Sequence, residues 1–216
     1  MNAVNIVVQT LDNRFVVFHQ NKYAIPGDTL SPVGGFIDDG ESPFTAARRE
    51  VLEELGLGSR KTLERVAEAV ITSEEGLHNN DGGSSSVSAL SVSQVKNAIS
   101  QTALPILDST GLPGGQVEND PDWVFLGRYR TAANRGGGFL YSYLLKNAVP
   151  LVQGGGILAY VGSGDDEQQE ILYLTEDEVL EAVSEGKFQE VKWAATFALS
   201  LLHLKVGMPG CCAENK

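Results

Sequence analysis

The chain of 216 residues has little cysteine, few aromatic residues and a shortage of positive charge. Its two cysteines, Cys211 and Cys212, are adjacent, which excludes a disulfide framework and the spacing of a zinc site. Only 16 residues are Lys or Arg against 28 Asp or Glu, and the net charge of −12 argues against nucleic acid or anionic membranes as partners. No apolar run approaches the roughly 20 residues of a membrane span, and a strand pattern rather than a signal peptide follows Met1. We therefore expect a cytoplasmic protein without a membrane partner.

Length and composition predict a single domain with one insertion. A hydrophobic content of 42% allows a core of useful size. Over residues 73–120 the composition changes to Ser, Gly, Asn and Asp, which predicts an inserted flexible segment. We expect one domain over residues 1–206 that contains this insertion, followed by a disordered tail over residues 207–216.

Strands interrupted by one early helix and closed by late helices predict a mixed sheet of the α+β class. Residues 27–40 look like a loop, and the late helices are expected from Thr175 to about Gly186 and over about 190–205. The expected strands are Asn5–Thr10, Arg14–Phe18, Leu63–Thr72, Trp123–Arg130, Phe139–Leu145 and Ile171–Leu174.

The early helix has clear start and stop signals. Ser42 is a good N-cap, Pro43 suits the first helical position, and Gly56 suits the position just past the end. Apolar residues at helical spacing inside it, from Phe44 to Leu55, predict a buried stripe.

Three carboxylates, Glu50, Glu53 and Glu54, share one flank of this helix at the spacing i, i+3 and i+4. Two interpretations remain open. The neighbouring arginines and water neutralise a solvated face, or a hard divalent cation binds among the carboxylates. The second interpretation needs a loop that approaches closely, and Gly34-Gly35 permits one.

The spacing around these carboxylates resembles the Nudix box and is complete at every fixed position. The matching residues are Gly35, Glu41, Arg49-Glu50-Val51, Glu53-Glu54 and Gly56-Leu57. Chance agreement at a given start is less than about one in a hundred million on average residue usage. The resemblance implies a Nudix-type α/β/α sandwich with a mixed β-sheet. It favours the second interpretation, in which a divalent cation binds among the carboxylates.

Carried over residue by residue, the resemblance implies that Glu50 and Glu54 bind Mg²⁺ or Mn²⁺. Glu53 would be a further ligand and the Gly34 carbonyl another. Gly35, Glu41, Arg49 and Gly56 would be structural residues of the motif, with Arg49 pairing with Glu41.

Residues 30–41 and 166–201 resemble the branch of ADP-ribose and nucleoside-diphosphate-sugar pyrophosphatases. This likeness implies that Glu167 activates water as the general base. Glu170 is the second candidate for this role and Glu53 the third. The alternative is that the acidic segment around Glu167 is only a solvated turn. Gln169 stands where that branch often has another carboxylate, which leaves the number of metal ions open. Relatives commonly have an N-terminal subdomain that forms a dimer and stacks adenine, whereas here the first strand begins almost at Met1, so a homodimer and the base specificity stay open.

Three arginines are candidates for contacts with substrate phosphates, namely Arg128, Arg130 and Arg135. Solvent-facing positions on a strand pair explain the first two equally well. The three histidines, His19, His78 and His203, have no partner spacing and are expected to be structural or exposed.

These observations predict a metal-dependent hydrolase that splits a nucleoside diphosphate linked to another moiety, with ADP-ribose or an ADP-sugar as its small-molecule substrate. One alternative is a Nudix hydrolase for dinucleoside polyphosphates, NADH, coenzyme A or diphosphoinositols, although the acidic charge disfavours the last. Another is a sensor module that binds a nucleotide without turnover.

Overall fold

The computed structural model of the chain describes residues 1–75, 120–134, 136–151 and 169–206. These residues form one mixed sheet with helices on both of its faces. The elements in chain order are β1 (Ala3–Thr10), β2 (Phe15–Asn21), β3 (Asp28–Ser31), β4 (Val33–Phe36), α1 (Pro43–Leu55), β5 (Leu57–Gly58), α2 (Arg60–Glu75), β6 (Trp123–Arg130), β7 (Phe139–Pro150), β8 (Gln169–Leu174), α4 (Glu176–Ser184) and α5 (Val191–Val206).

β1 and β7 form the centre of the sheet and run parallel to each other, in register from Ala3 with Leu140 to Val8 with Leu145. All other described pairings are antiparallel. β6 continues the sheet beyond β7, and β8 continues it beyond β2. The mixed sheet predicted from the sequence is confirmed.

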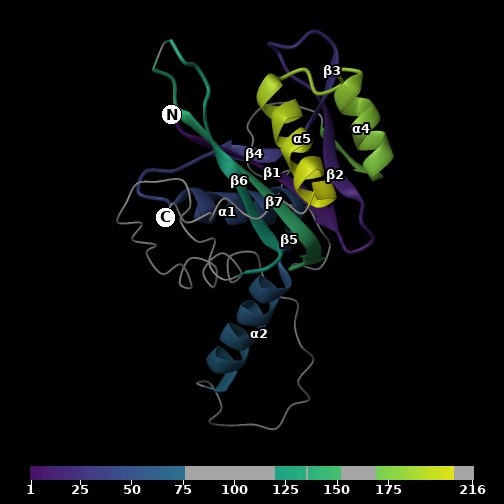
Figure 1. The fold of residues 1–216 in the computed structure, drawn as a ribbon. Coiled ribbons are helices and arrows are strands. Elements are labelled where there is room, and N and C mark those ends of the chain that lie inside the picture. Colours follow the sequence, from purple (N-terminus) through teal and green to yellow (C-terminus); the bar gives the residue numbers. More distant parts are fainter. Residues whose placement is uncertain (76–119, 135, 152–168, 207–216) are drawn as a thin grey trace, which may run out of the picture.

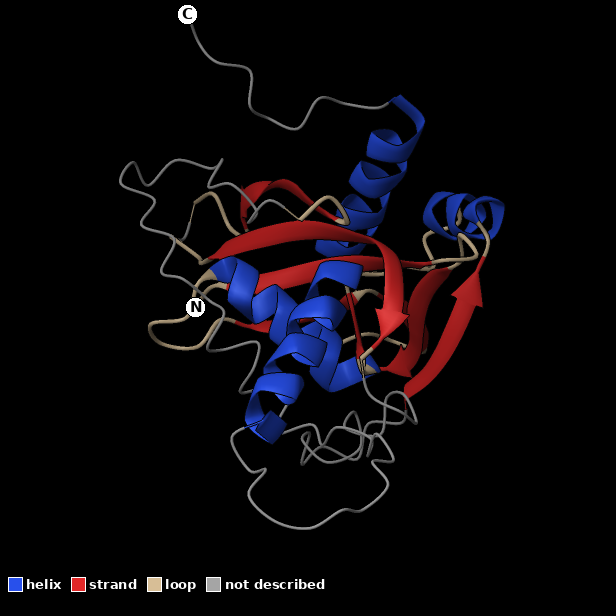
Figure 2. Cartoon of the chain, turned by 90° about the horizontal axis from the view of Figure 1, so that it is seen from below, coloured by secondary structure: helices blue, strands red, loops and turns tan. Residues whose placement is uncertain are grey.

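Two hydrophobic cores lie on opposite faces of this sheet. α1 packs on one face over Val4, Ile6 and Tyr143. α4 and α5 cover the other face, where Phe197 and Val179 pack on Val7 and its neighbours. Figure 1 shows α4 and α5 together over β1 and β2, and Figure 2 shows the sheet as a layer between the two sets of helices. This α/β/α arrangement agrees with the expected fold class.

One edge of β1 has two partners, and this opens a fork in the sheet. Residues Ala3 to Ile6 pair with β4, whereas Val8 and Gln9 pair with β2. The corresponding edge of β2 leaves β1 after Val16 and pairs with β3 from Phe18 onward. The strand pairs β1–β4 and β2–β3 therefore diverge, and a cavity lies between them.

Polar contacts attach the start of α2 to β6 and β7. The Ser59 hydroxyl donates to Asp120 Oδ2 at 2.6 Å, and Arg60 Nη2 donates to Asp122 Oδ1 at 3.0 Å. Asn147 Nδ2 donates to the same oxygen of Asp122 at 2.9 Å. Asp122 is 3% exposed, so its charge depends on these donors.

Two local predictions were wrong. The segment expected as a strand over Leu63–Thr72 lies inside α2, because its apolar residues also recur at helical spacing and Ser59 accepts a hydrogen bond from the Thr62 backbone N–H. The segment expected as a loop over residues 27–40 contains β3 and β4, which pair with β2 and β1 despite their Ser, Thr and Gly content.

Other local predictions agree with the structure. α1 begins at Pro43 after the N-cap Ser42, and Gly56 follows it with φ of 66°. Thr175 and Glu178 form the expected capping box at α4. The insertion and the tail lie mainly outside the described residues, although the first part of residues 73–120 belongs to α2. Among the helices that the structure describes, none is long and apolar enough to cross a membrane.

Candidate metal centre and adjoining cavity

The loop between β4 and α1 is attached to the helix through Arg49. Its Nε and Nη2 atoms donate to the two oxygens of Glu41, each at 3.0 Å. Nη2 also donates to the Phe36 carbonyl at 3.0 Å, while Nη1 donates to Glu50 at 2.8 Å and Glu53 at 3.1 Å. The hydrogen bond with Glu41, followed by the other nearby carboxylates, raises the pKa of Arg49. One guanidinium thus carries the positive charge for three carboxylates.

Glu54 lies in a different environment from Glu53. Its Oε2 atom has almost no contact with solvent and no hydrogen-bond partner among the described residues. Burial, together with the charge of Glu50, raises the pKa of Glu54 to about 8, against the effect of the Gly34 backbone N–H that donates to it. Burial likewise raises the pKa of Glu50, although Arg49 opposes the shift. At both carboxylates, the effect of burial therefore outweighs that of the neighbouring positive charge.

The glycine pair upstream is required by close packing. A Cβ atom on Gly35 would overlap the carboxylate of Glu50, and one on Gly34 would overlap the Val4 carbonyl and the Asn5 side chain. These positions can hold only glycine if the β4 backbone is to lie against the carboxylates. The loop and the helix therefore bring backbone and carboxylate oxygens to one region.

These features fit a hard divalent cation. A buried carboxylate oxygen without a partner, beside a second buried carboxylate, is stabilised by a cation that accepts oxygen ligands. Among the described residues, no three His, Cys, Asp or Glu side chains already surround a single point as metal ligands. Arg49 lies between Glu50 and Glu53 instead, so a bound cation would take over part of the compensation that Arg49 provides.

The cavity in the fork of the sheet, which we call the fork cavity, adjoins Glu54. Its volume is about 270 Å³. Gly34, Gly35 and Phe36 of β4 form part of its wall. Gln20, Lys22, Glu54, Lys192 and Trp193 also line it.

Charge and polarity differ along the wall of the fork cavity. Lys22 is close enough to Glu54 to lower its pKa, against the larger effect of burial. Gln169 Nε2 donates to Gln20 Oε1 at 2.8 Å, and Gln20 Nε2 donates to Ser31 Oγ at 2.5 Å. The two lysines and Trp193 were missed by the sequence analysis, because only the divergence of β1 and β2 brings them to the Glu54 side of the molecule.

Several residues proposed from the sequence lie away from this cavity. Arg128 and Arg130 stack on Phe139 of the neighbouring strand, with the guanidinium carbons 3.4 Å and 3.9 Å from the ring centre. Glu170 Oε2 lies 3.5 Å from His19 Nδ1. Successive residues of a strand face opposite sides of the sheet, and Gln169 lines the fork cavity, so Glu170 faces away from Glu54. Glu167 and Arg135 lie outside the described residues.

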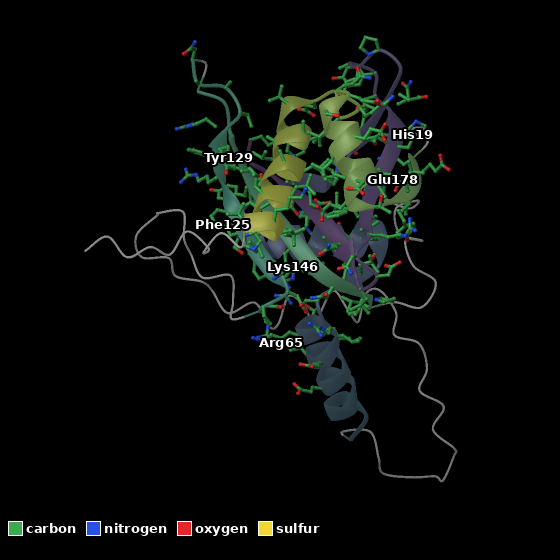
Figure 3. The ribbon with its side chains drawn as sticks, turned by 45° about the vertical axis from the view of Figure 1, so that its right-hand side comes forward. His19, Arg65, Phe125, Tyr129, Lys146 and Glu178 are labelled. Carbon is green, nitrogen blue, oxygen red and sulfur yellow. The ribbon has the colours of Figure 1, made fainter. Side chains whose placement is uncertain are left out.

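A larger cavity of about 410 Å³ lies between β2, β3 and α4. His19 and Glu178, both labelled in Figure 3, line it from β2 and α4. Its wall also contains Asp28, Glu181 and Glu185 but no residue of α1. This acidic cavity is separate from the candidate metal centre.

The fold and the loop–helix site together define a Nudix domain, and comparison with known proteins agrees. Residues 1–103 match the family model of the NUDIX domain. This match covers slightly less than half of the 216 residues and shows a NUDIX domain in the first part of the chain. Nudix enzymes generally use divalent metals such as Mg²⁺ or Mn²⁺ and act on small nucleotide derivatives.

The similarity to solved structures extends over most of the chain. A crystal structure of an ADP compounds hydrolase matches 96% of this chain and 74% of its own, with a TM-score of 0.56 and 15% sequence identity. At this identity the match shows the fold. No curated protein matches the chain in sequence.

Proposed function

We propose that this chain is a metal-dependent pyrophosphohydrolase that splits a nucleoside diphosphate linked to another moiety, with ADP-ribose or an ADP-sugar as its substrate. The products would be a nucleoside monophosphate and a sugar phosphate. The observation that carries the proposal is the buried, unpartnered Oε2 of Glu54 at the wall of a cavity that two lysines also line.

Metal binding at this site is assigned to Glu50, Glu54, the Gly34 carbonyl and, as a further ligand, Glu53. A divalent cation bound there supplies positive charge that stabilises the phosphoryl oxygens and the leaving group. Arg49 fixes the positions of Glu50 and Glu53 and holds the loop through Glu41. We assign contacts with the outer oxygens of the diphosphate to Lys22, which lines the fork cavity and lies close to Glu54.

Proton removal from the attacking water is assigned to Glu167. A general base must lie within hydrogen-bond reach of the proton that it takes, directly or through one water. Glu170 does not share the cavity with Glu54, which leaves Glu53 as the alternative among the described candidates.

The assignment to ADP derivatives draws support from the structural match to the ADP compounds hydrolase and from the resemblance of residues 30–41 and 166–201. A panel of ADP-ribose, ADP-sugars, dinucleoside polyphosphates, NADH and coenzyme A, each with Mg²⁺ or Mn²⁺, tests it when products are identified by mass. We expect AMP and a sugar phosphate from an ADP-sugar or ADP-ribose. Faster turnover of another substrate class would show that the assignment to ADP derivatives is wrong, while the assignment as a hydrolase would stand.

One observation favours a second candidate, a nucleotide-binding module without turnover. Arg49 donates hydrogen bonds to both Glu50 and Glu53, so the protein itself offsets part of the charge of the carboxylate cluster. Binding of ADP without turnover of any substrate in the panel would establish that alternative.

A further inference from the structure

We propose that Trp193 is the platform on which the base of the substrate stacks, so that the first turn of α5 forms the nucleoside end of the fork cavity. This inference deepens the proposed function and rests on it. Trp193 lies in the wall of the same cavity as Glu54, although α5 and α1 pack on opposite faces of the sheet. Because the pairs β1–β4 and β2–β3 diverge, residues of both α1 and α5 can contact one ligand in the fork cavity.

Part of the Trp193 side chain has a structural role in packing. It contacts the core beneath α4 and α5, and its backbone N–H donates to the Glu190 carbonyl at 2.9 Å in the first turn of the helix. The ring is only partly buried, however, and it also lines the fork cavity. A tryptophan that presents part of its ring to a cavity offers a flat apolar surface to a ligand.

The position of this turn is fixed relative to the metal centre. Asn5 Nδ2 of β1 donates to the Lys192 carbonyl at 3.5 Å, and Thr196 Oγ1 donates to the same carbonyl at 2.8 Å. Asn5 is also the register partner of Gly34, the residue whose backbone N–H donates to Glu54. This series of contacts connects Glu54 through Gly34 and Asn5 to Lys192. It fixes the position of Trp193 relative to the metal centre, as a preorganised subsite requires.

The size of the cavity indicates which part of a substrate it holds. Its volume of about 270 Å³ lies just below the range of about 300–1,000 Å³ for pockets that enclose a whole small ligand. It therefore holds one half of a dinucleotide-like or sugar-linked molecule.

Chemistry favours the nucleoside half. Lys22 and Glu54 mark the phosphate and cation end, and Trp193 with the largely exposed Phe36 supplies aromatic surface elsewhere on the wall. Bases of every kind stack on aromatic side chains because each has a π face. The exposed Gln169 adds a neutral amide suited to the edge of a base, and its position is fixed by the hydrogen bond that it donates to the buried Gln20.

Kinetics of Trp193→Leu test the proposal, since leucine keeps an apolar contact with the core and removes the stacking surface. With ADP-ribose and Mg²⁺ we expect KM to rise roughly 5- to 150-fold, the loss equivalent to stacking of one base on an aromatic ring. We expect kcat to stay close to the wild-type value, because the lost contact is the same in ground and transition states. Trp193→Phe should restore most of the affinity.

Tyr173→Ala is the matched control, because Tyr173 is an exposed aromatic residue of β8 that is not part of the cavity wall. Its KM should equal that of the wild type. An unchanged KM in Trp193→Leu, or an equal rise in Tyr173→Ala, overturns the stacking proposal while the hydrolase activity of the wild type stands.

Fluorescence gives a second test that needs neither turnover nor a Trp193 variant. Trp123 and Trp193 are the two tryptophans of the chain, so Trp123→Phe leaves Trp193 as the single tryptophan fluorophore. ADP with Mg²⁺ should quench its emission saturably, and inorganic pyrophosphate with Mg²⁺ should not. Unchanged emission with ADP overturns the subsite, whereas quenching by ADP in a protein without turnover supports the subsite and rejects the proposed reaction.

Discussion

Arg49 and Glu41 form a bidentate pair in which two guanidinium nitrogens each lie 3.0 Å from a carboxylate oxygen. Both side chains are largely buried, with exposed fractions of 23% and 12%. Lysine cannot reproduce this two-point geometry or reach Glu50 and Glu53 at the same time.

We therefore expect Arg49→Lys to lower the free energy of unfolding by about 1–3 kcal/mol, because it leaves buried acceptors without donors. Urea denaturation of the metal-free protein measures this change. Arg14→Lys is the control, since Arg14 is exposed and should change stability by less than about 0.5 kcal/mol. Equal stability of the two variants would mean that the pair contributes nothing to the fold.

Glu54→Gln should separate metal binding from folding. Without metal, we expect the melting temperature to stay the same or rise, because burial favours the uncharged form of Glu54 and the amide is uncharged as well. Mg²⁺ should raise the melting temperature of the wild type, and this increase should be much smaller for the variant. Turnover should fall by more than the roughly 10- to 100-fold that is typical when a residue only orients a metal ligand.

Calorimetry and a steady-state assay on the same preparations check both parts of this prediction. Wild-type turnover of Glu54→Gln with Mg²⁺ would show that the metal assignment is wrong.

Glu167→Gln should lower kcat by roughly 10²- to 10⁴-fold with little change in KM, as the loss of a positioned general base does. Glu170→Gln should have a much smaller effect, since Glu170 lies beside His19 and faces away from Glu54. Steady-state kinetics of the two variants decide between them. Small and equal effects would indicate a solvated turn and would move the search for the base to Glu53.

Asp122 should make stability sensitive to acid. Burial tends to raise its pKa, but the hydrogen bonds from Arg60 and Asn147 outweigh burial and hold the pKa below its ordinary value. A folded-state pKa below the unfolded value contributes stability that is present above the unfolded pKa of about 3.9 and is lost as the pH falls through the folded pKa.

Urea denaturation between pH 2 and pH 7 measures this contribution. We expect Asp122→Asn to be less stable at pH 7 by about 1.5–3 kcal/mol and to approach the wild type at the acid end. A constant difference across that range would show that the Asp122 charge does not contribute.

Local signals explain which parts of the fold and site were predictable. The caps at Ser42 and Gly56 and the carboxylate spacing of α1 depend on neighbours in sequence, so the motif and the helix bounds could be read directly. The partners of Arg49 were only partly foreseeable: its pairing with Glu41 was expected, whereas its contacts with Glu50 and Glu53 depend on side-chain packing around one guanidinium.

Tertiary contacts account for what was missed. β3 and β4 contain few apolar residues and exist because β2 and β1 supply their hydrogen-bond partners. Lys22, Lys192 and Trp193 come from segments far apart in sequence and meet only at the fork. Arg128 and Arg130 looked available for phosphates, but Phe139 lies opposite on β7 and their guanidinium groups stack on it.

The parallel pairing of β1 with β7 has a consequence for folding during synthesis. β1 leaves the ribosome more than a hundred residues before its central partner. Until then the β1 edge that β7 will cover lacks its hydrogen-bond partner, and pairings between such distant segments form slowly. Residues 1–103, which match the Nudix family model, contain the motif but not β7, so that piece alone would expose an apolar strand edge and aggregate rather than fold.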